Sequence, residues 1–320
     1  METWLTSDAA EELAAAYGIR IRATLPMRSV VGLLSDKGRL ISKRYGQEKG
    51  MSYRRLLGIV KAKEALARRG LVRPYLTTVS GEPLFAWLGA PVTVEGWVKG
   101  RHVDLRDRRE RLEAVRAVAR LHRQRIAIPS ELKPDHTLLH KLSGRLQRSR
   151  QAVEAGRLVG ISQAEWGYFV ERALRVLRVL STSKWESFIM DDKNAGVFCH
   201  RDLAPHNIMI ERGSPATLID FDLAGMDSPI YDLYQLFDHV TYRAFPPQGW
   251  AEEMLRAYEQ INPLSRRQRQ ALALLQSFPS LLLREVADLG SVKGERARDR
   301  LGTRIRYVRT LEEERSIAIP

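Results

Sequence analysis

The sequence predicts an α+β protein with two lobes, a small antiparallel β-rich N-terminal lobe and a larger, mostly helical C-terminal lobe. Apolar and polar residues alternate over residues 19–23, 30–34 and 39–45, which is typical of half-buried strands. From Arg106 onward, apolar residues recur at three- and four-residue spacings, which indicates amphipathic helices. At 320 residues the chain exceeds what one hydrophobic core usually organises, so two closely joined units are expected.

The small lobe is expected to begin with a short helix. Thr6, Ser7 and Asp8 form a capped start, and Gly18 supplies the stop. A turn at residues 35–38 joins two of the alternating stretches into antiparallel strands. A helix over residues 53–69 follows, since its apolar residues share one face, and Gly70 closes it.

Further strands are expected at residues 75–79, 84–87 and 91–98. The lobe boundary then falls after residue 98, which gives an N-lobe of residues 1–98, a C-lobe of residues 99–320 and a hinge at Lys99-Gly100. The main interruption of the helical C-lobe is a predicted hairpin. Two short apolar runs, residues 207–210 and 216–219, flank a turn-forming stretch at residues 211–215.

The composition favours a cytoplasmic protein. The N-terminus carries acids at Glu2 and Asp8 and lacks the basic start and apolar run of a secretory signal. No run approaches the roughly 18 uncharged apolar residues needed to span a bilayer. The single cysteine, Cys199, can form neither an internal disulfide nor a cysteine-based zinc site, which fits a reducing compartment.

The formal net charge of +14 has two interpretations. Arginines interleaved with acids at helical spacing are typical of solvated helix faces. A basic surface could instead attract an acidic partner, such as nucleotide phosphates, nucleic acid or an anionic coat assembly. Charge alone selects none of these, and a nucleic-acid partner is not expected because it rests on nothing else.

The chemistry of the chain concentrates in residues 198–222. Asp202, Asn207 and Asp220 are the residue types that phosphoryl transfer from ATP needs: a carboxylate beside the incoming hydroxyl, and oxygen ligands for magnesium. Asn207 lies five positions after Asp202, and the predicted hairpin separates Asn207 from Asp220. A strand pair brings its ends together, so the three side chains are expected to converge.

This stretch resembles the protein-kinase-like superfamily through its H-x-D-x-x-x-x-N catalytic loop and the later Asp-Phe motif. The resemblance implies that Asp202 orients or deprotonates the acceptor hydroxyl and that Asn207 and Asp220 bind magnesium. His200 is expected to hold the loop rather than act as a base. Two departures from protein kinases, Ala204 and Asp222, point to the aminoglycoside and choline phosphotransferase branch.

Within that branch, the sequence is similar to the CotS family of spore-coat proteins. The similarity rests on Phe198-Cys199-His200, on Ile219-Asp220-Phe221-Asp222, on the segment from Val94 to Gly100, and on distal Pro-Leu-Ser and Phe-Pro motifs. It implies that Asp232, in the stretch after the Asp-Phe-Asp motif, braces the catalytic loop, and that the backbone near Glu95 meets the nucleotide base. A solvated Glu95 is the alternative.

The small lobe supplies the other expected parts of the site. The resemblance places at Lys43 the lysine that contacts the α- and β-phosphates; a solvated strand lysine is the alternative. Glu64 is the only acid in the following helix and therefore the candidate ion-pair partner of Lys43, or else a solvated residue. Residues 25–32 contain one glycine, where kinases commonly use several to cover the phosphates, so nucleotide grip is expected to be weak or different.

Two functions follow from these observations. The first is an ATP- and magnesium-dependent phosphotransferase acting on a hydroxyl of a small molecule or spore-coat component. The alternative is a catalytically weak or inactive kinase-fold structural protein of the spore coat, favoured by the CotS resemblance and the glycine-poor loop. Either protein would reside in the cytoplasm. The resemblance implies the mother-cell cytoplasm first and then the spore coat, where other coat proteins would be its partners.

Overall fold

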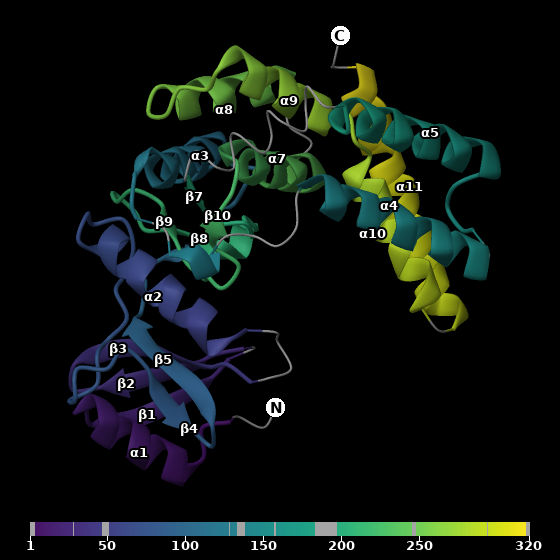
Figure 1. Ribbon diagram of the computed structural model, residues 1–320. Coiled ribbons are helices and arrows are strands. Elements are labelled where there is room, and N and C mark those ends of the chain that lie inside the picture. Colours follow the sequence, from purple (N-terminus) through teal and green to yellow (C-terminus); the bar gives the residue numbers. More distant parts are fainter. Residues whose placement is uncertain are drawn as a thin grey trace.

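The computed structural model describes residues 4–27, 29–46, 51–127, 129–132, 138–156, 158–182, 197–244, 248–292 and 294–317. The predicted α+β class is confirmed. A five-stranded antiparallel sheet with helices α1 and α2 forms one end of the molecule, and a larger helical part forms the other (Figure 1).

The sheet sets which residues of the small lobe face the larger one. Its strands are β1 (Ile21–Pro26), β2 (Val31–Ser35), β3 (Gly38–Arg44), β4 (Phe85–Trp87) and β5 (Ala90–Gly96), in the order β1-β2-β3-β5-β4. In the β3–β5 pair, Ile41 lies opposite Glu95 and Lys43 opposite Thr93. Opposed residues of an antiparallel pair share a face, so Lys43 and Glu95 lie on the same side of the sheet.

Helix α1 (Ser7–Tyr17) packs on the opposite face of this sheet. Its predicted start and stop are confirmed: the Thr6 hydroxyl accepts a hydrogen bond from Ala9 N, and Gly18 closes the helix at φ 56°. Its buried residues join those of β2, β3 and β5 in one hydrophobic cluster. Helix α1 therefore stabilises the sheet from outside and leaves the face with Lys43 to the site.

The predicted strand at residues 75–79 is wrong. Tyr75 forms only an isolated bridge with Glu95, and Leu76 N donates to Val94 O at 2.7 Å. Beyond it the backbone leaves β5, and Val79 N donates to Ala16 O at the end of α1 at 2.8 Å. The apolar alternation there reflects packing of an irregular segment across α1 and the sheet.

Helix α2 (Tyr53–Ala67) joins the two parts of the molecule. Ile59, Ala62 and Leu66 belong to the largest hydrophobic cluster, which continues through the helical part, whereas Leu56 and Val60 belong to a smaller cluster with Tyr45. Because α2 shares a core with both parts, a boundary after residue 98 stays a prediction.

The helical part is organised around α7 and α10. Helix α10 contacts α4 and α11, α4 contacts α5, α8 lies against α3, and α9 against α7 (Figure 1). The bounds are α3 (Arg108–Arg123), α4 (Leu138–Ala155), α5 (Gln163–Leu180), α7 (Pro229–Ala244), α8 (Trp250–Glu259), α9 (Arg266–Gln276), α10 (Ser280–Ala287) and α11 (Glu295–Ile317), with short 3-10 turns at Ser130–Leu132, Pro205–Asn207 and Asp288–Gly290. Among the described residues, no helix is both long and apolar enough to cross a membrane.

Short strands hold the predicted chemistry in place. The predicted hairpin is confirmed as β8 (Ile208–Ile210) and β9 (Thr217–Leu218), and β6 (Arg101–His102) extends it. Strand β7 (Phe198–Cys199) pairs with β10 (Gly225–Met226).

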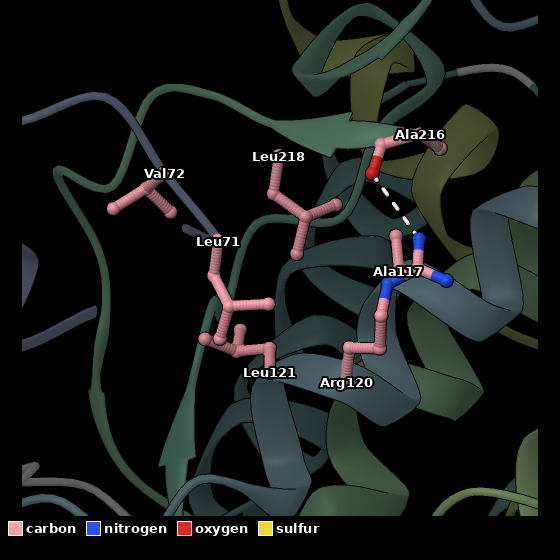
Figure 2. A pocket seen from close by; sticks show the side chains of 7 residues that line it. All are labelled: Leu71, Val72, Ala117, Arg120, Leu121, Ala216 and Leu218. Atoms are coloured by element: carbon pink, nitrogen blue, oxygen red, sulfur yellow. Dashed lines mark hydrogen bonds between the residues drawn. The ribbon is translucent and has the colours of Figure 1, made fainter. Parts of the chain in front are cut away.

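Helix α3 holds the β8–β9 hairpin in place. Arg120 of α3 donates to Ala216 O at 3.3 Å beside a cavity of about 10 Å³ (Figure 2). Leu218, Leu71 and Leu121 also line this cavity, which has room for no more than about one water molecule. The cavity is therefore a packing gap rather than a ligand site.

Candidate active site

The catalytic loop runs from β7 to the start of β8. Asp202 is half-buried, and Asn207, 2% exposed, closes the loop after a single 3-10 turn. The Asn207 Nδ2 donates to the Asp202 backbone oxygen at 2.8 Å and to its Oδ2 at 3.2 Å. The amide therefore fixes the orientation of the Asp202 carboxylate and keeps Oδ1 as the oxygen that Asn207 can offer a cation.

Asp232, in the first turn of α7, braces this loop. Its Oδ2 accepts from His200 N at 2.7 Å and lies 3.0 Å from His122 Nε2, and its Oδ1 accepts from Arg201 N at 2.7 Å. Burial opposes ionisation of this fully buried carboxyl, but the hydrogen bonds and the histidine neighbours outweigh burial and lower its pKa. An ionised Asp232 thus holds the backbone of the two residues before Asp202.

The Arg201 backbone adopts φ 66° under this restraint, a conformation that costs a non-glycine residue about 1–2 kcal/mol. The Arg201 side chain is held separately, with its Nε 3.0 Å from Asp227 Oδ2. Both contacts fix the position of the chain just before Asp202.

His200 connects the catalytic loop to the second carboxylate segment. Its Nε2 donates to Ile219 O at 2.8 Å, and its ring lies 4.8 Å from that of Phe221. Ile219 N in turn donates to Asn207 O at 3.0 Å. These bonds bring Asp220 beside Asn207 and leave His200 fully buried.

Lys43 reaches from β3 to the Asp-Phe-Asp segment. Its Nζ lies 2.9 Å from Asp220 Oδ1 and 2.7 Å from Asp222 Oδ2, and Tyr45 OH donates to Asp222 Oδ1 at 3.2 Å. Asp220 has φ 61°, again left-handed for a non-glycine residue. The structure therefore brings Lys43, Asp202, Asn207 and Asp220 to one region between the two parts of the molecule.

The charges of this lysine and its two carboxylates depend on one another. Burial disfavours all three charges, yet the two carboxylates raise the pKa of Lys43, and the Lys43 ammonium lowers the pKa of Asp220 against the effect of burial. For Asp222, burial and the neighbouring Asp220 raise the pKa despite Lys43. Asp220 is therefore the more firmly ionised carboxylate, as a cation ligand must be.

The predicted ion pair between Glu64 and Lys43 is wrong. The Glu64 side chain is 62% exposed and pairs with Arg68 one turn later, at 2.9 Å. The residue of α2 that turns inward is its neighbour Lys63, whose Nζ lies 2.6 Å from Glu95 Oε2 and 3.7 Å from the centroid of the Tyr75 ring. Asp222, rather than an acid of α2, supplies the second counter-charge of Lys43.

Glu95 is paired rather than free in solvent, and it lies on the same face of the sheet as Lys43. Its backbone lies within β5, and its side chain binds Lys63 on the α2 side. Trp97, just beyond β5, covers β2, because a Cβ at Gly32 would lie only 2.8 Å from its Cζ3. The Trp97 side chain thus packs against the glycine-poor segment of residues 25–32, of which residue 28 lies outside the described residues.

Sequence reasoning missed Lys63, although the signal was present. Lys63 lies four residues after Ile59 and three before Leu66, so helical spacing places it on the buried face of α2. Asp222 was recognised as a departure from the protein-kinase pattern, but nothing in the sequence indicated that it binds Lys43.

A larger cavity opens beside Asp202. Its volume is about 320 Å³, and its walls come from α4, the catalytic loop, α7 and α10. Asp202, Ala204 and His206 form its catalytic-loop wall. The cavity is large enough for a small molecule whose hydroxyl meets the Asp202 carboxylate.

A kinase-like fold with these side chains gathered between its two parts defines a phosphotransferase class of protein. A match to the model described as the Phosphotransferase enzyme family covers residues 29–309. The chain belongs to this family.

Solved structures share the fold at low sequence identity. An aminoglycoside phosphotransferase from Alicyclobacillus acidocaldarius is 15% identical, with a TM-score of 0.82 over 100% of this chain and 96% of that one. An amicoumacin kinase in complex with AMP-PNP and Ca²⁺ is 17% identical, with a TM-score of 0.65 over 95% and 93%. The choline kinase from Streptococcus pneumoniae is 13% identical, with a TM-score of 0.59 over 98% and 100%.

Proposed function

We propose that this protein is an ATP- and magnesium-dependent phosphotransferase that acts on a hydroxyl of a small molecule. The observation that carries the proposal is the convergence of Lys43, Asp202, Asn207 and Asp220 beside a cavity of about 320 Å³. Asp202 accepts the hydroxyl proton as the acceptor oxygen bonds to the γ-phosphorus. The bond from that phosphorus to the β–γ bridging oxygen breaks, and ADP leaves.

The residues present fit a magnesium ion. Asn207 donates its Nδ2 to Asp202, which leaves the amide oxygen for a cation, and Asp220 is ionised and 38% exposed through its side chain. Amide and carboxylate oxygens are the ligands that this hard cation prefers. When bound, magnesium neutralises phosphate charge as the transfer proceeds.

Lys43 supplies the phosphate contact in this proposal. Two carboxylates hold its ammonium charged and in place, so it is ready to exchange one of them for a phosphate oxygen. The backbone after Glu95 would meet the base, with the N-lobe of residues 1–98 covering the nucleotide and residues 99–320 supplying the loops. An amicoumacin kinase of the same fold was solved with AMP-PNP, which supports a nucleotide at this cleft.

The test is transfer itself. The purified protein is incubated with γ-labelled ATP, magnesium and a panel of hydroxyl compounds, beside Asp202→Asn, which keeps the size of the side chain. We expect label on an acceptor, or at least ATP turnover to water, at a rate that falls roughly a hundredfold or more in Asp202→Asn. Equal turnover in both proteins would refute the assignment of Asp202.

A structural role in a spore coat is the second candidate. It is favoured by the similarity to CotS proteins and by the single glycine in residues 25–32, which offers few amides to phosphates. This role places the protein in the mother-cell cytoplasm and then in the coat, bound to other coat proteins. Absence of any change in melting temperature with Mg-ATP, together with recovery of the protein in the coat fraction of spores, would favour this candidate over the enzyme.

A further inference from the structure

If the protein is a phosphotransferase as proposed, the side chains that line the cavity beside Asp202 indicate the chemical class of its acceptor. Three cationic side chains line it from two helices. Lys141 and Arg145 lie one turn apart on α4, and Arg284 comes from α10. Residues four apart on a helix are neighbours on one face, so the α4 pair presents two adjacent positive charges to the same space.

These cations are weakly compensated. Among the described residues, neither Lys141 nor Arg145 pairs with a carboxylate: Lys141 lies 3.4 Å from Tyr231 OH, and Arg145 donates to the Ser280 hydroxyl. Arg284 lies 3.7 Å from Glu285, whose closer partner is Arg304.

The acids of the cavity do not balance these charges. They are Asp202, which the reaction needs for the acceptor hydroxyl, and Asp238 of α7, which is 7% exposed. His206 and His239 also line the space. With Asp202 reserved for the hydroxyl, Asp238 is the one other carboxylate of the described residues that lines the cavity beside Lys141 and Arg145, while Arg284 has Glu285 outside it.

The electrostatics of Lys141 agree with this count. Burial, the largest effect, lowers the pKa of Lys141, and the nearby Arg201 and Arg55 lower it further. Asp227 and Asp232 raise it, but by less, so the pKa of Lys141 falls to about 8. A ligand oxyanion would supply the missing counter-charge. The face of Tyr231 in this wall is not open to a ligand cation, because the Lys141 ammonium already lies over it, 4.6 Å from its centroid.

We infer that the acceptor carries an oxyanion, a carboxylate or a phosphate, which binds Lys141, Arg145 and Arg284 while its hydroxyl meets Asp202. A cationic acceptor, such as the choline of the structurally similar choline kinase, would place its charge against two uncompensated cations. The geometry thus assigns this site to anionic hydroxy compounds and not to amines.

The first test uses a series of hexoses that share the pyranose ring and differ in their charged group: glucosamine, glucose, glucuronate and glucose 6-phosphate. We expect transfer or competitive inhibition to be strongest for the two anions and weakest for glucosamine. Glucuronate and glucose 6-phosphate distinguish a carboxylate from a phosphate as the preferred group. Preference for glucosamine would overturn the inference.

The second test does not need an acceptor. Sulfate, whose charge is constant near neutral pH, is titrated at fixed ionic strength while the melting temperature is followed in Lys141→Met, Arg145→Gln and the control Arg148→Gln. Arg148 is exposed on the same helix outside the cavity. Each cavity variant should bind sulfate roughly tenfold or more weakly, since each loses a hydrogen bond to a charged group. Arg148→Gln should respond like wild type.

Nucleotide binding separates this inference from the proposed function. Lys43→Met should lose stabilisation by Mg-ADP and keep the sulfate response, whereas Lys141→Met should show the reverse. A sulfate response that is equal in wild type, Lys141→Met and Arg145→Gln would refute the oxyanion site. If Mg-ADP does not raise the melting temperature of the wild type, the proposed phosphotransferase function is refuted. The sulfate titrations would still show whether the cavity binds an oxyanion.

Discussion

The inward-facing lysine of α2 leads to a prediction that can be sized from the structure. Lys63 is replaced by Met, which keeps the apolar stem and removes the charge. The Lys63 side chain is 3% exposed, Glu95 is 26% exposed, and 2.6 Å separates their charged atoms. Breaking a fully buried pair by removing one partner costs about 3–5 kcal/mol. Because water reaches Glu95, we expect about 2–3 kcal/mol, including the lost contact with Tyr75.

The assay is urea unfolding followed by circular dichroism, with a double-mutant cycle through Glu95→Gln. We expect Lys63→Met and Glu95→Gln each to lower the unfolding midpoint, and the double variant to lose less than the sum, with a coupling of about 1–2 kcal/mol. The matched control is Glu64→Gln next to it, which removes an exposed pair and should cost under about 0.5 kcal/mol. A larger loss in Glu64→Gln than in Lys63→Met would refute the placement of α2.

Three further predictions concern the catalytic loop, Gly100 and the cavity. Asp232→Asn should lower the free energy of unfolding by about 3 kcal/mol, because it leaves buried N–H groups facing an amide. Because the pKa of Asp232 is lowered by folding, the extra stability of the wild type should be present above about pH 4 and be lost as pH falls through the folded pKa. Melting curves at acid pH measure this loss. Gly100→Ala should cost about 3 kcal/mol or more in thermal melting, because its Cβ would lie 2.2 Å from Ile210 O at φ 106°, whereas Gly213→Ala, at φ 79° with open space around it, should cost about 1 kcal/mol. The sulfate response should decline from pH 7 to pH 9 in wild type as Lys141, with its pKa of about 8, loses its charge, and it should stay flat in Lys141→Met.

Much of the fold could be predicted because its signals are local. The cap at Thr6, the stop at Gly18 and the turn after Ser35 each depend on a few adjacent residues. The hairpin between Asn207 and Asp220 was predicted for the same reason, and with it their proximity. The predicted strand at residues 75–79 was wrong because an alternating pattern does not reveal whether a free strand edge is available for pairing.

The site was harder to predict where charges choose partners across the molecule. Glu64 was named because an acid was expected opposite Lys43, and Lys63 was overlooked, although the apolar spacing of α2 puts Lys63 inside. The Asp-Phe-Asp segment supplies that acid instead: Asp220, 177 residues away, and Asp222 both pair with Lys43. The cations of the cavity likewise come from helices α4 and α10, and no local sequence pattern predicts that these two helices pack together.

A structure with magnesium and a non-hydrolysable ATP analogue tests the central claim most directly. We expect the Lys43 ammonium to contact phosphate oxygens and to release at least one of its carboxylates, with Asn207 and Asp220 as protein ligands of the cation. The bond between Lys63 and Glu95 should persist, because neither side chain is assigned a phosphate or magnesium contact. Nucleotide bound elsewhere, or phosphates that leave Lys43 paired with both Asp220 and Asp222, would contradict the account.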